Sequence, residues 1–131
     1  VVRTGRVAEE LISLSKNIKR VAALLSDARE CEFIGVAIPE KMALAETVRL
    51  TETLVRLKVP MRRLLVNNVL PETAAAACEF CAARRREQQR VIKSFRTQLG
   101  QVEQLFIAPQ QPAEIRGAER LRAHFAGWRE I

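Results

Sequence analysis

The sequence predicts an α/β fold, namely part of a mostly parallel sheet with flanking helices. Two short apolar runs, residues 33–38 and 64–70, lack the alternation of a half-exposed strand and are typical of strands covered on both faces. A third run spans residues 102–107. Stretches with helical spacing separate the three runs, so we expect parallel strands joined by right-handed crossovers, with helices on both faces of the sheet.

The first element is a long amphipathic helix. Its apolar positions recur in steps of four and three, which places them along a single stripe. These positions are Val7, Leu11, Leu14, Ile18, Val21 and Leu25. Such a stripe normally packs against another helix, so we expect it to be buried against a neighbour in this chain or in a partner.

Helical patterns also follow each apolar run. Leu44, Val48, Thr51 and Val55 share one face of a helix that Pro60 stops. Residues 71–77 suggest a loop or a frayed helix start, and a polar helix then spans residues 78–99. The Pro-bounded loop 108–112 precedes a last helix, which we expect from about Ala113.

Composition limits the possible functions. The chain has 131 residues, of which 48% are hydrophobic, enough for one domain or a piece of one. Charges interrupt every apolar stretch, so membrane insertion is not expected. The net charge of +7 would attract nucleic acid, yet the chain has no Tyr, one Trp and five Phe for base stacking, so no nucleic-acid partner is expected.

The chain start and the cysteines favour a cytoplasmic protein. Val1 is preceded by no Met and followed by no signal-peptide pattern, which suggests that the sequence is cut from a longer chain. Three cysteines are too few for the disulfide framework of a small secreted domain.

Two asparagines, Asn67 and Asn68, stand at the carboxyl end of the second apolar run. In open α/β sheets ligands bind outside the carboxyl ends of the strands, where a carboxamide is well placed to contact a ligand's edge. The alternative is a pair that only forms a turn. Both interpretations stay open on the local sequence.

Cys78 and Cys81 place two thiols at the start of a helix, a spacing that suits one metal ion. Structural zinc takes four ligands, so the other two would come from Cys31 and His124, or from the same pair in a second copy of the chain. A redox dithiol and two unpaired structural cysteines are the alternatives.

No catalytic residues are predicted. Arg84, Arg85 and Arg86 are consecutive on a helix and should point in different directions, as on a solvated face. The single histidine, His124, has no nucleophile at a recognisable spacing, and no pair of carboxylates suggests acid–base work.

Several segments, read in order, resemble one family, the arsenical pump-driving ATPases and the related ATPases that target tail-anchored membrane proteins. The family's conserved segments read I-P-E-x-x-x-L-x-E-T-x-R-L, V-N-Q, C-x-x-C and P-x-x-x-x-E-I-R-G. Their counterparts are Ile38-Pro39-Glu40 with Leu44-Ala45-Glu46-Thr47 and Arg49-Leu50, Val66-Asn67, Cys78 with Cys81, and Pro109 with Glu114-Ile115-Arg116-Gly117. Asn68 departs from the family's usual Gln.

The resemblance implies a P-loop-ATPase-type sheet with an added helical subdomain. Residues 1–32 would be a helix from that subdomain, and residues 33–131 the C-terminal part of the ATPase domain. Asn67 would contact the adenine of ATP, and Pro109 with Gln110 would begin the loop that covers the base. Cys78 and Cys81 would bind zinc shared across a homodimer. The phosphate-binding loop that holds ATP with Mg²⁺ would lie upstream, so this segment alone is predicted to be inactive.

The partner implied by the resemblance is either a tail-anchored membrane protein client or a membrane arsenite pump. Two alternatives belong to other classes of protein: a zinc-bridged interaction module without a nucleotide role, and a basic RNA-binding domain.

Overall fold

A computed structural model describes residues 2–76 and 78–131 and confirms the α/β fold. Its sheet has four strands in the order β1-β2-β3-β4, of which the first three are parallel and β4 is antiparallel to β3. The strands are β1 (Ile34–Ala37), β2 (Arg63–Val69), β3 (Gln104–Pro109) and β4 (Arg129–Glu130). The sequence did not predict β4, because its two exposed charged residues carry no apolar signal.

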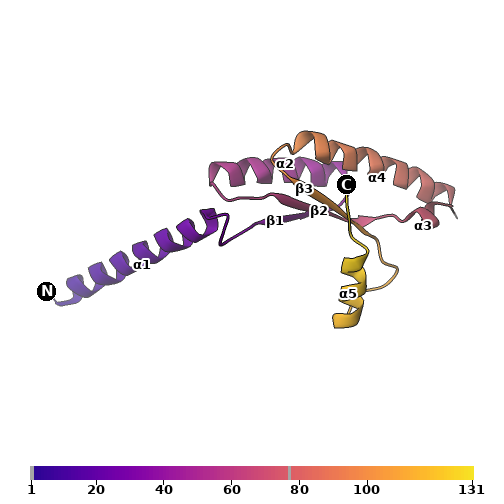
Figure 1. The fold of residues 1–131 in the computed structure, drawn as a ribbon. Helices are drawn as coiled ribbons and strands as arrows, with labels where there is room; N and C mark the ends of the chain where they lie inside the picture. The colour runs from indigo at the N-terminus through magenta and orange to yellow at the C-terminus, as the bar shows by residue number, and fades with distance from the viewer. Residues whose placement is uncertain (1, 77) are drawn as a thin grey trace.

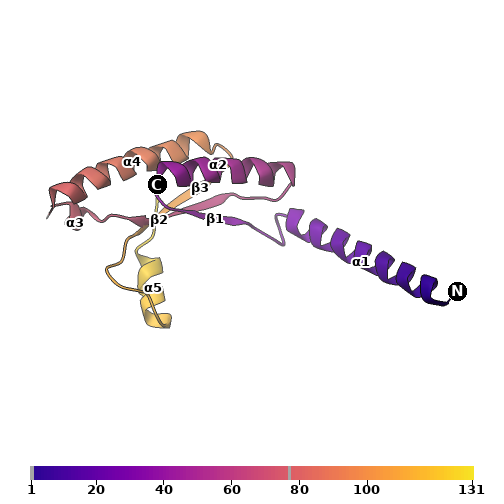
Figure 2. The same cartoon turned by 180° about the vertical axis from the view of Figure 1, so that it is seen from behind.

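The helices are α1 (Val2–Ser26), α2 (Lys41–Arg56), α3 (Glu72–Ala76), α4 (Glu79–Gln98) and α5 (Ala118–Ala126). Figures 1 and 2 show α2 and α4 side by side on one face of the sheet, where Lys41 and Glu87 join them through an ion pair of 3.0 Å. Flanking helices are thus confirmed, but in the described residues the helices that pack closely on the sheet lie on one face and not on both as predicted. Helix α5 lies on the other side but contributes no buried residue.

The core lies between these two helices and the sheet. Its largest fully buried apolar side chains are Phe95 of α4 and Leu64 and Val66 of β2, which are 1%, 1% and 0% exposed. Of the stripe predicted on α2, Leu44 and Thr51 are buried, whereas Val55 is 60% exposed. The buried side of α2 is instead completed by Thr47 and Leu54.

A β-bulge interrupts β2 near its carboxyl end. The register pairs Val66 with Ile107 and Val69 with Pro109, so β2 has one residue more than β3 over this span. Asn68 has φ of 60°, a left-handed conformation that asparagine tolerates better than most residues. The extra residue restores the alternation, so that Val69, like Val66, belongs to the core.

Helix α1 extends away from the sheet (Figure 1), and its predicted stripe is not buried. The six stripe side chains are 43–61% exposed, from Leu25 at 43% to Leu11 at 61%. The periodicity predicts the helix correctly, but the described residues of this chain place no second helix over the stripe.

The last helix begins at Ala118, five residues after the predicted start at Ala113. Gly117, the residue before it, has φ of 83°, which is outside the helical region. The chain from Gln110 to Gly117 therefore forms an irregular loop, in which Arg116 and Glu114 form an ion pair of 2.6 Å.

Candidate functional site

The carboxyl ends of β2 and β3 lie side by side. Val69 pairs with Pro109, and the backbone N–H of Gln110 donates a hydrogen bond of 2.8 Å to the carbonyl oxygen of Val69. The structure thus brings the strand that carries Asn67 next to the loop that starts at Gln110, although 43 residues separate the two in the sequence. Parallel pairing makes this edge a suitable place for a ligand.

The side chains at this edge point to two different faces. Asn67 follows the core residue Val66, so by strand alternation it projects from the face opposite α2 and α4, where it is half-buried. Pro109 is half-buried and its ring packs toward Gly127, so that a Cβ at Gly127 would lie 3.6 Å from the proline Cγ. Gln110 is exposed. The backbones of the predicted site residues therefore meet, whereas the side chains of Asn67 and Pro109 leave the sheet on opposite sides.

Gln88 of α4 holds the bulge from the helix side. Its Oε1 accepts a hydrogen bond of 2.8 Å from the N–H of Leu70, and its Nε2 donates one of 3.3 Å to the carbonyl oxygen of Asn68. The side chain is 5% exposed. A buried carboxamide that pairs with backbone on both sides of one residue fixes the path of the chain there.

Gln88 is not among the site residues predicted from the sequence, although its position carries a signal. Gln88 shares the helical spacing of the buried apolar residues Val91, Ile92 and Phe95, so it stands inside an apolar stripe. A polar residue in such a stripe needs a buried partner. The sequence does not show which backbone groups would supply it.

Cys78 and Cys81 lie together at the start of α4. Cys78 is the N-cap, and its Sγ accepts a hydrogen bond of 3.3 Å from the backbone N–H of Cys81. A hydrogen bond from the Cys81 thiol, followed by the one from the backbone, lowers the pKa of the Cys78 thiol below its ordinary value. The same hydrogen bond between the two thiols raises the pKa of the Cys81 thiol above its ordinary value. The pair is thus biased toward one thiolate at Cys78.

Cys31 and His124 do not complete a metal site with these cysteines. Within residues 2–76 and 78–131 no group of three or more His, Cys, Asp or Glu side chains could hold a metal ion. His124 contacts the ring of Trp128 edge-on instead, with centroids 6.0 Å apart. The described residues therefore exclude a four-ligand zinc site within one chain, and a second copy of the Cys78–Cys81 pair is the other source of ligands that the sequence predicts.

The three consecutive arginines of α4 do point in different directions, as predicted. Arg84 lies 3.9 Å from a carboxylate oxygen of Glu40, and Arg85 lies 4.0 Å from one of Glu72. Arg86 is exposed.

In the described part of the chain, no helix is both long enough and apolar enough to cross a membrane.

A mostly parallel sheet with α2 and α4 on one face and polar residues at the strand ends is consistent with part of an α/β domain of the P-loop ATPase type. Residues 2–127 match the anion-transporting ATPase family, and the chain belongs to that family.

Similar proteins carry the name ATPase. ATPase GET3B of Arabidopsis thaliana is 36% identical over 117 residues, which are 88% of this chain and 28% of that protein. ATPase GET3C of the same plant is 35% identical over 123 residues, or 92% of this chain and 31% of the relative. ATPase GET3 of Podospora anserina is 32% identical over 123 residues, or 89% and 34%. The chain thus spans about a third of the length of these relatives.

Proposed function

We propose that this chain is the C-terminal part of an ATPase and that Asn67, Pro109 and Gln110 form the adenine side of its ATP site. One observation carries the proposal: the hydrogen bond from Gln110 N–H to Val69, 2.8 Å long, sets the start of the covering loop beside the strand that bears Asn67. A carboxamide offers the donor and the acceptor that the edge of adenine requires. The ATPase names of the relatives support the same function.

The resemblance assigns different functions to different segments of the chain. Residues 33–131 would supply the base contacts, and residues 1–32, which contain α1, would belong to a helical subdomain. No segment of this sequence reads G-x-x-x-x-G-K-[ST], the loop whose backbone holds the phosphates and whose hydroxyl holds Mg²⁺. Turnover of ATP with Mg²⁺ is therefore proposed for a longer chain and not for these residues alone.

A zinc ion shared by a homodimer is the second part of the proposal. Cys78 is exposed at the N-terminus of α4, and Cys81 is half-exposed one turn later. Two thiolates suit zinc, which needs four ligands, and a twofold axis beside this helix end would bring together two such pairs. The lowered pKa of Cys78 favours the thiolate form that binds metal.

The expected partner is a tail-anchored membrane protein whose targeting depends on ATP hydrolysis. The C-x-x-C pair and the similarity to the ATPases named GET3B, GET3C and GET3 support this branch of the family. Export of arsenite through a membrane pump is the second candidate, and the description of the family as anion-transporting ATPases favours it.

Native mass spectrometry with and without a chelator tests the zinc site. We expect a dimer that carries one zinc and dissociates when the metal is removed. Cys78→Ser with Cys81→Ser should abolish both the zinc and the dimer, whereas Cys31→Ser, the matched control, should keep them. A monomer without zinc in the presence of excess Zn²⁺ would rule out the shared site.

The nucleotide role is tested separately by NMR titration of the chain with ATP and with GTP. We expect the Asn67 side-chain amide to shift with ATP more than with GTP, and Asn67→Ala to remove the preference while Asn17→Ala on α1 keeps it. Equal shifts with both nucleotides would contradict the adenine contact. Zinc and dimerisation without any nucleotide effect would indicate an interaction module, and tight, salt-sensitive RNA binding a nucleic-acid domain.

A further inference from the structure

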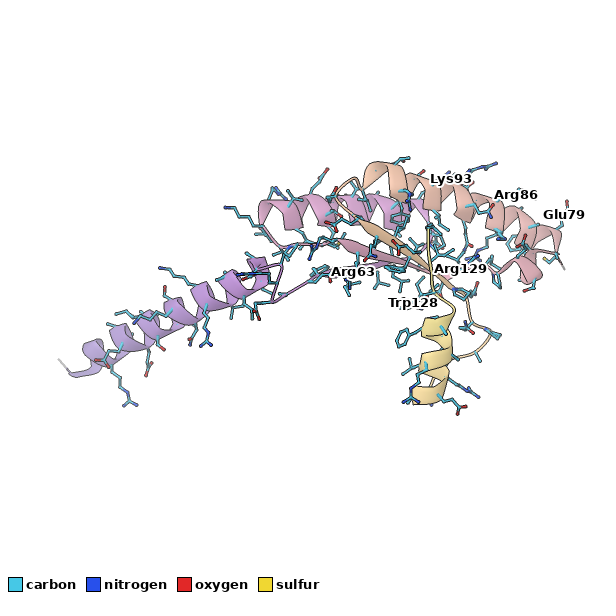
Figure 3. All side chains as sticks on the ribbon, viewed as in Figure 1. Arg63, Glu79, Arg86, Lys93, Trp128 and Arg129 are labelled. Carbon is cyan, nitrogen blue, oxygen red and sulfur yellow. The ribbon has the colours of Figure 1, made fainter. Side chains whose placement is uncertain are left out.

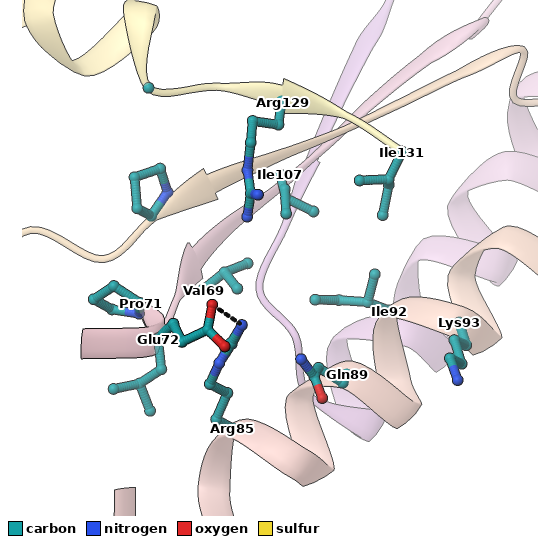
Figure 4. Close-up of a pocket in the computed structure, with 13 residues that line it drawn as sticks. Val69, Pro71, Glu72, Arg85, Gln89, Ile92, Lys93, Ile107, Arg129 and Ile131 are labelled. Atoms are coloured by element: carbon teal, nitrogen blue, oxygen red, sulfur yellow. Dashed lines mark ion pairs between the residues drawn. The ribbon is translucent and has the colours of Figure 1, made fainter. Parts of the chain in front are cut away.

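A cavity of about 690 Å³ opens beside the carboxyl ends of β2 and β3, on the face that α4 covers. Figure 4 shows it between α4 and the short strand β4. Its walls combine aliphatic side chains from β2, β3, α4 and the residue that follows β4, and Pro109 marks its border with the edge described above. The aliphatic residues are Val69, Ile92, Ile107 and Ile131. Pro109 lines this cavity and also belongs to the proposed base contact, whereas Asn67 projects from the opposite face of the sheet.

The charged side chains around the cavity are unbalanced. Arg85, Lys93 and Arg129 line the cavity together with a single acidic side chain, that of Glu72. The Arg85 side chain is only 19% exposed, yet its nearest carboxylate oxygen is 4.0 Å away, at the limit of an ion pair. Among the ion pairs of residues 2–76 and 78–131, none includes Lys93 or Arg129. The cavity therefore carries excess positive charge beside an apolar wall.

The two guanidinium groups enter the cavity from opposite sides. In Figure 4, Arg129 extends from β4 toward α4, and Arg85 extends from α4 toward β4. Arg129 is exposed and the Arg85 side chain is partly buried, and an anion held near both groups would offset positive charge that Glu72 alone does not balance. Guanidinium groups bind carboxylate and phosphate oxygens through paired hydrogen bonds.

We propose that this cavity binds a small amphipathic anion. Its carboxylate or phosphate ester lies between Arg85 and Arg129, and its aliphatic body lies on Val69, Ile92 and Ile107. The volume falls within the range of about 300–1,000 Å³ that is usual for small-molecule sites. The proposal does not depend on nucleotide or zinc binding.

Isoleucine-methyl NMR of the 131-residue chain tests the proposal with four probes: octanoate, octyl phosphate, octanol and inorganic phosphate. We expect octanoate or octyl phosphate to shift the methyl groups of Ile92, Ile107 and Ile131, and the one that binds identifies the head group. Ile12 and Ile18 on the exposed face of α1 are internal controls for non-specific adsorption. Equal shifts on α1, or equal binding of octanol or of inorganic phosphate, would overturn the proposal.

Three variants test which arginines bind the head group of the anion. Arg129→Gln and Arg85→Gln should each weaken binding of the amphipathic anion about 10-fold, because each removes a charge-assisted hydrogen bond. Arg86→Gln, on the exposed side of α4, is the matched control and should bind as the parent chain does. Because the Arg85 side chain is largely buried, circular dichroism checks that the Arg85→Gln variant is folded. If Arg85→Gln unfolds, the affinity of Arg129→Gln decides the test. Unchanged affinity in Arg129→Gln would refute the site.

Discussion

Gln88 holds the bulge of β2 through two hydrogen bonds, so we expect a substitution of similar volume at this position to lower the stability of the fold considerably. Gln88→Leu keeps nearly the same volume but removes the acceptor of the Leu70 N–H, at 2.8 Å, and the donor to the Asn68 carbonyl, at 3.3 Å. A net hydrogen bond contributes about 1 kcal/mol, and a buried group left without a partner costs about 1–3 kcal/mol. We therefore expect the free energy of unfolding to fall by about 2 kcal/mol.

Urea unfolding followed by circular dichroism measures this loss. The matched control is Gln89→Leu, the exposed neighbour, which should change the free energy of unfolding by no more than about 0.5 kcal/mol. Hydrogen exchange supplies a local readout, because the Leu70 amide should lose protection in Gln88→Leu. If the two variants unfold at the same urea concentration, or if the Leu70 amide stays protected, the clamp does not hold the bulge.

Three further substitutions or reactions test other features of the fold and the site. Phe95→Ala should lower the free energy of unfolding by about 3–5 kcal/mol in the same urea titration, because the ring is 1% exposed at the centre of the core; a loss below about 1 kcal/mol would contradict that packing. Asn68→Val should cost about 1–2 kcal/mol at φ of 60°, whereas Asn68→Gly should be tolerated; equal stability of the two would argue against the left-handed bulge. Iodoacetamide at about pH 8 should alkylate Cys78 before Cys81, since the pKa of Cys78 is lowered and that of Cys81 is raised; peptide mass spectrometry reads the order, and prior labelling of Cys81 would refute it.

In the candidate site, the local sequence does not determine the conformation of each residue. The pair Asn67–Asn68 permitted a ligand contact or a turn, and the structure shows that the two residues differ in conformation. Asn68 takes the left-handed conformation of the bulge. Asn67 stays in the strand and projects away from α2 and α4, and its contact with adenine remains a prediction. The choice depends on the register of β2 against β3, which neither segment encodes by itself.

The sequence by itself determined the order and type of the main elements, because apolar runs and helical periods are local properties of the chain. It also determined the family, through motifs such as Ile38-Pro39-Glu40 and Glu114-Ile115-Arg116-Gly117. Only the tertiary structure decided that α2 and α4 share one face, that Gln88 holds the bulge, and that Arg85 and Arg129 line one cavity. These features arise from contacts between residues distant in sequence, and their geometry depends on how strands and helices pack rather than on any local pattern.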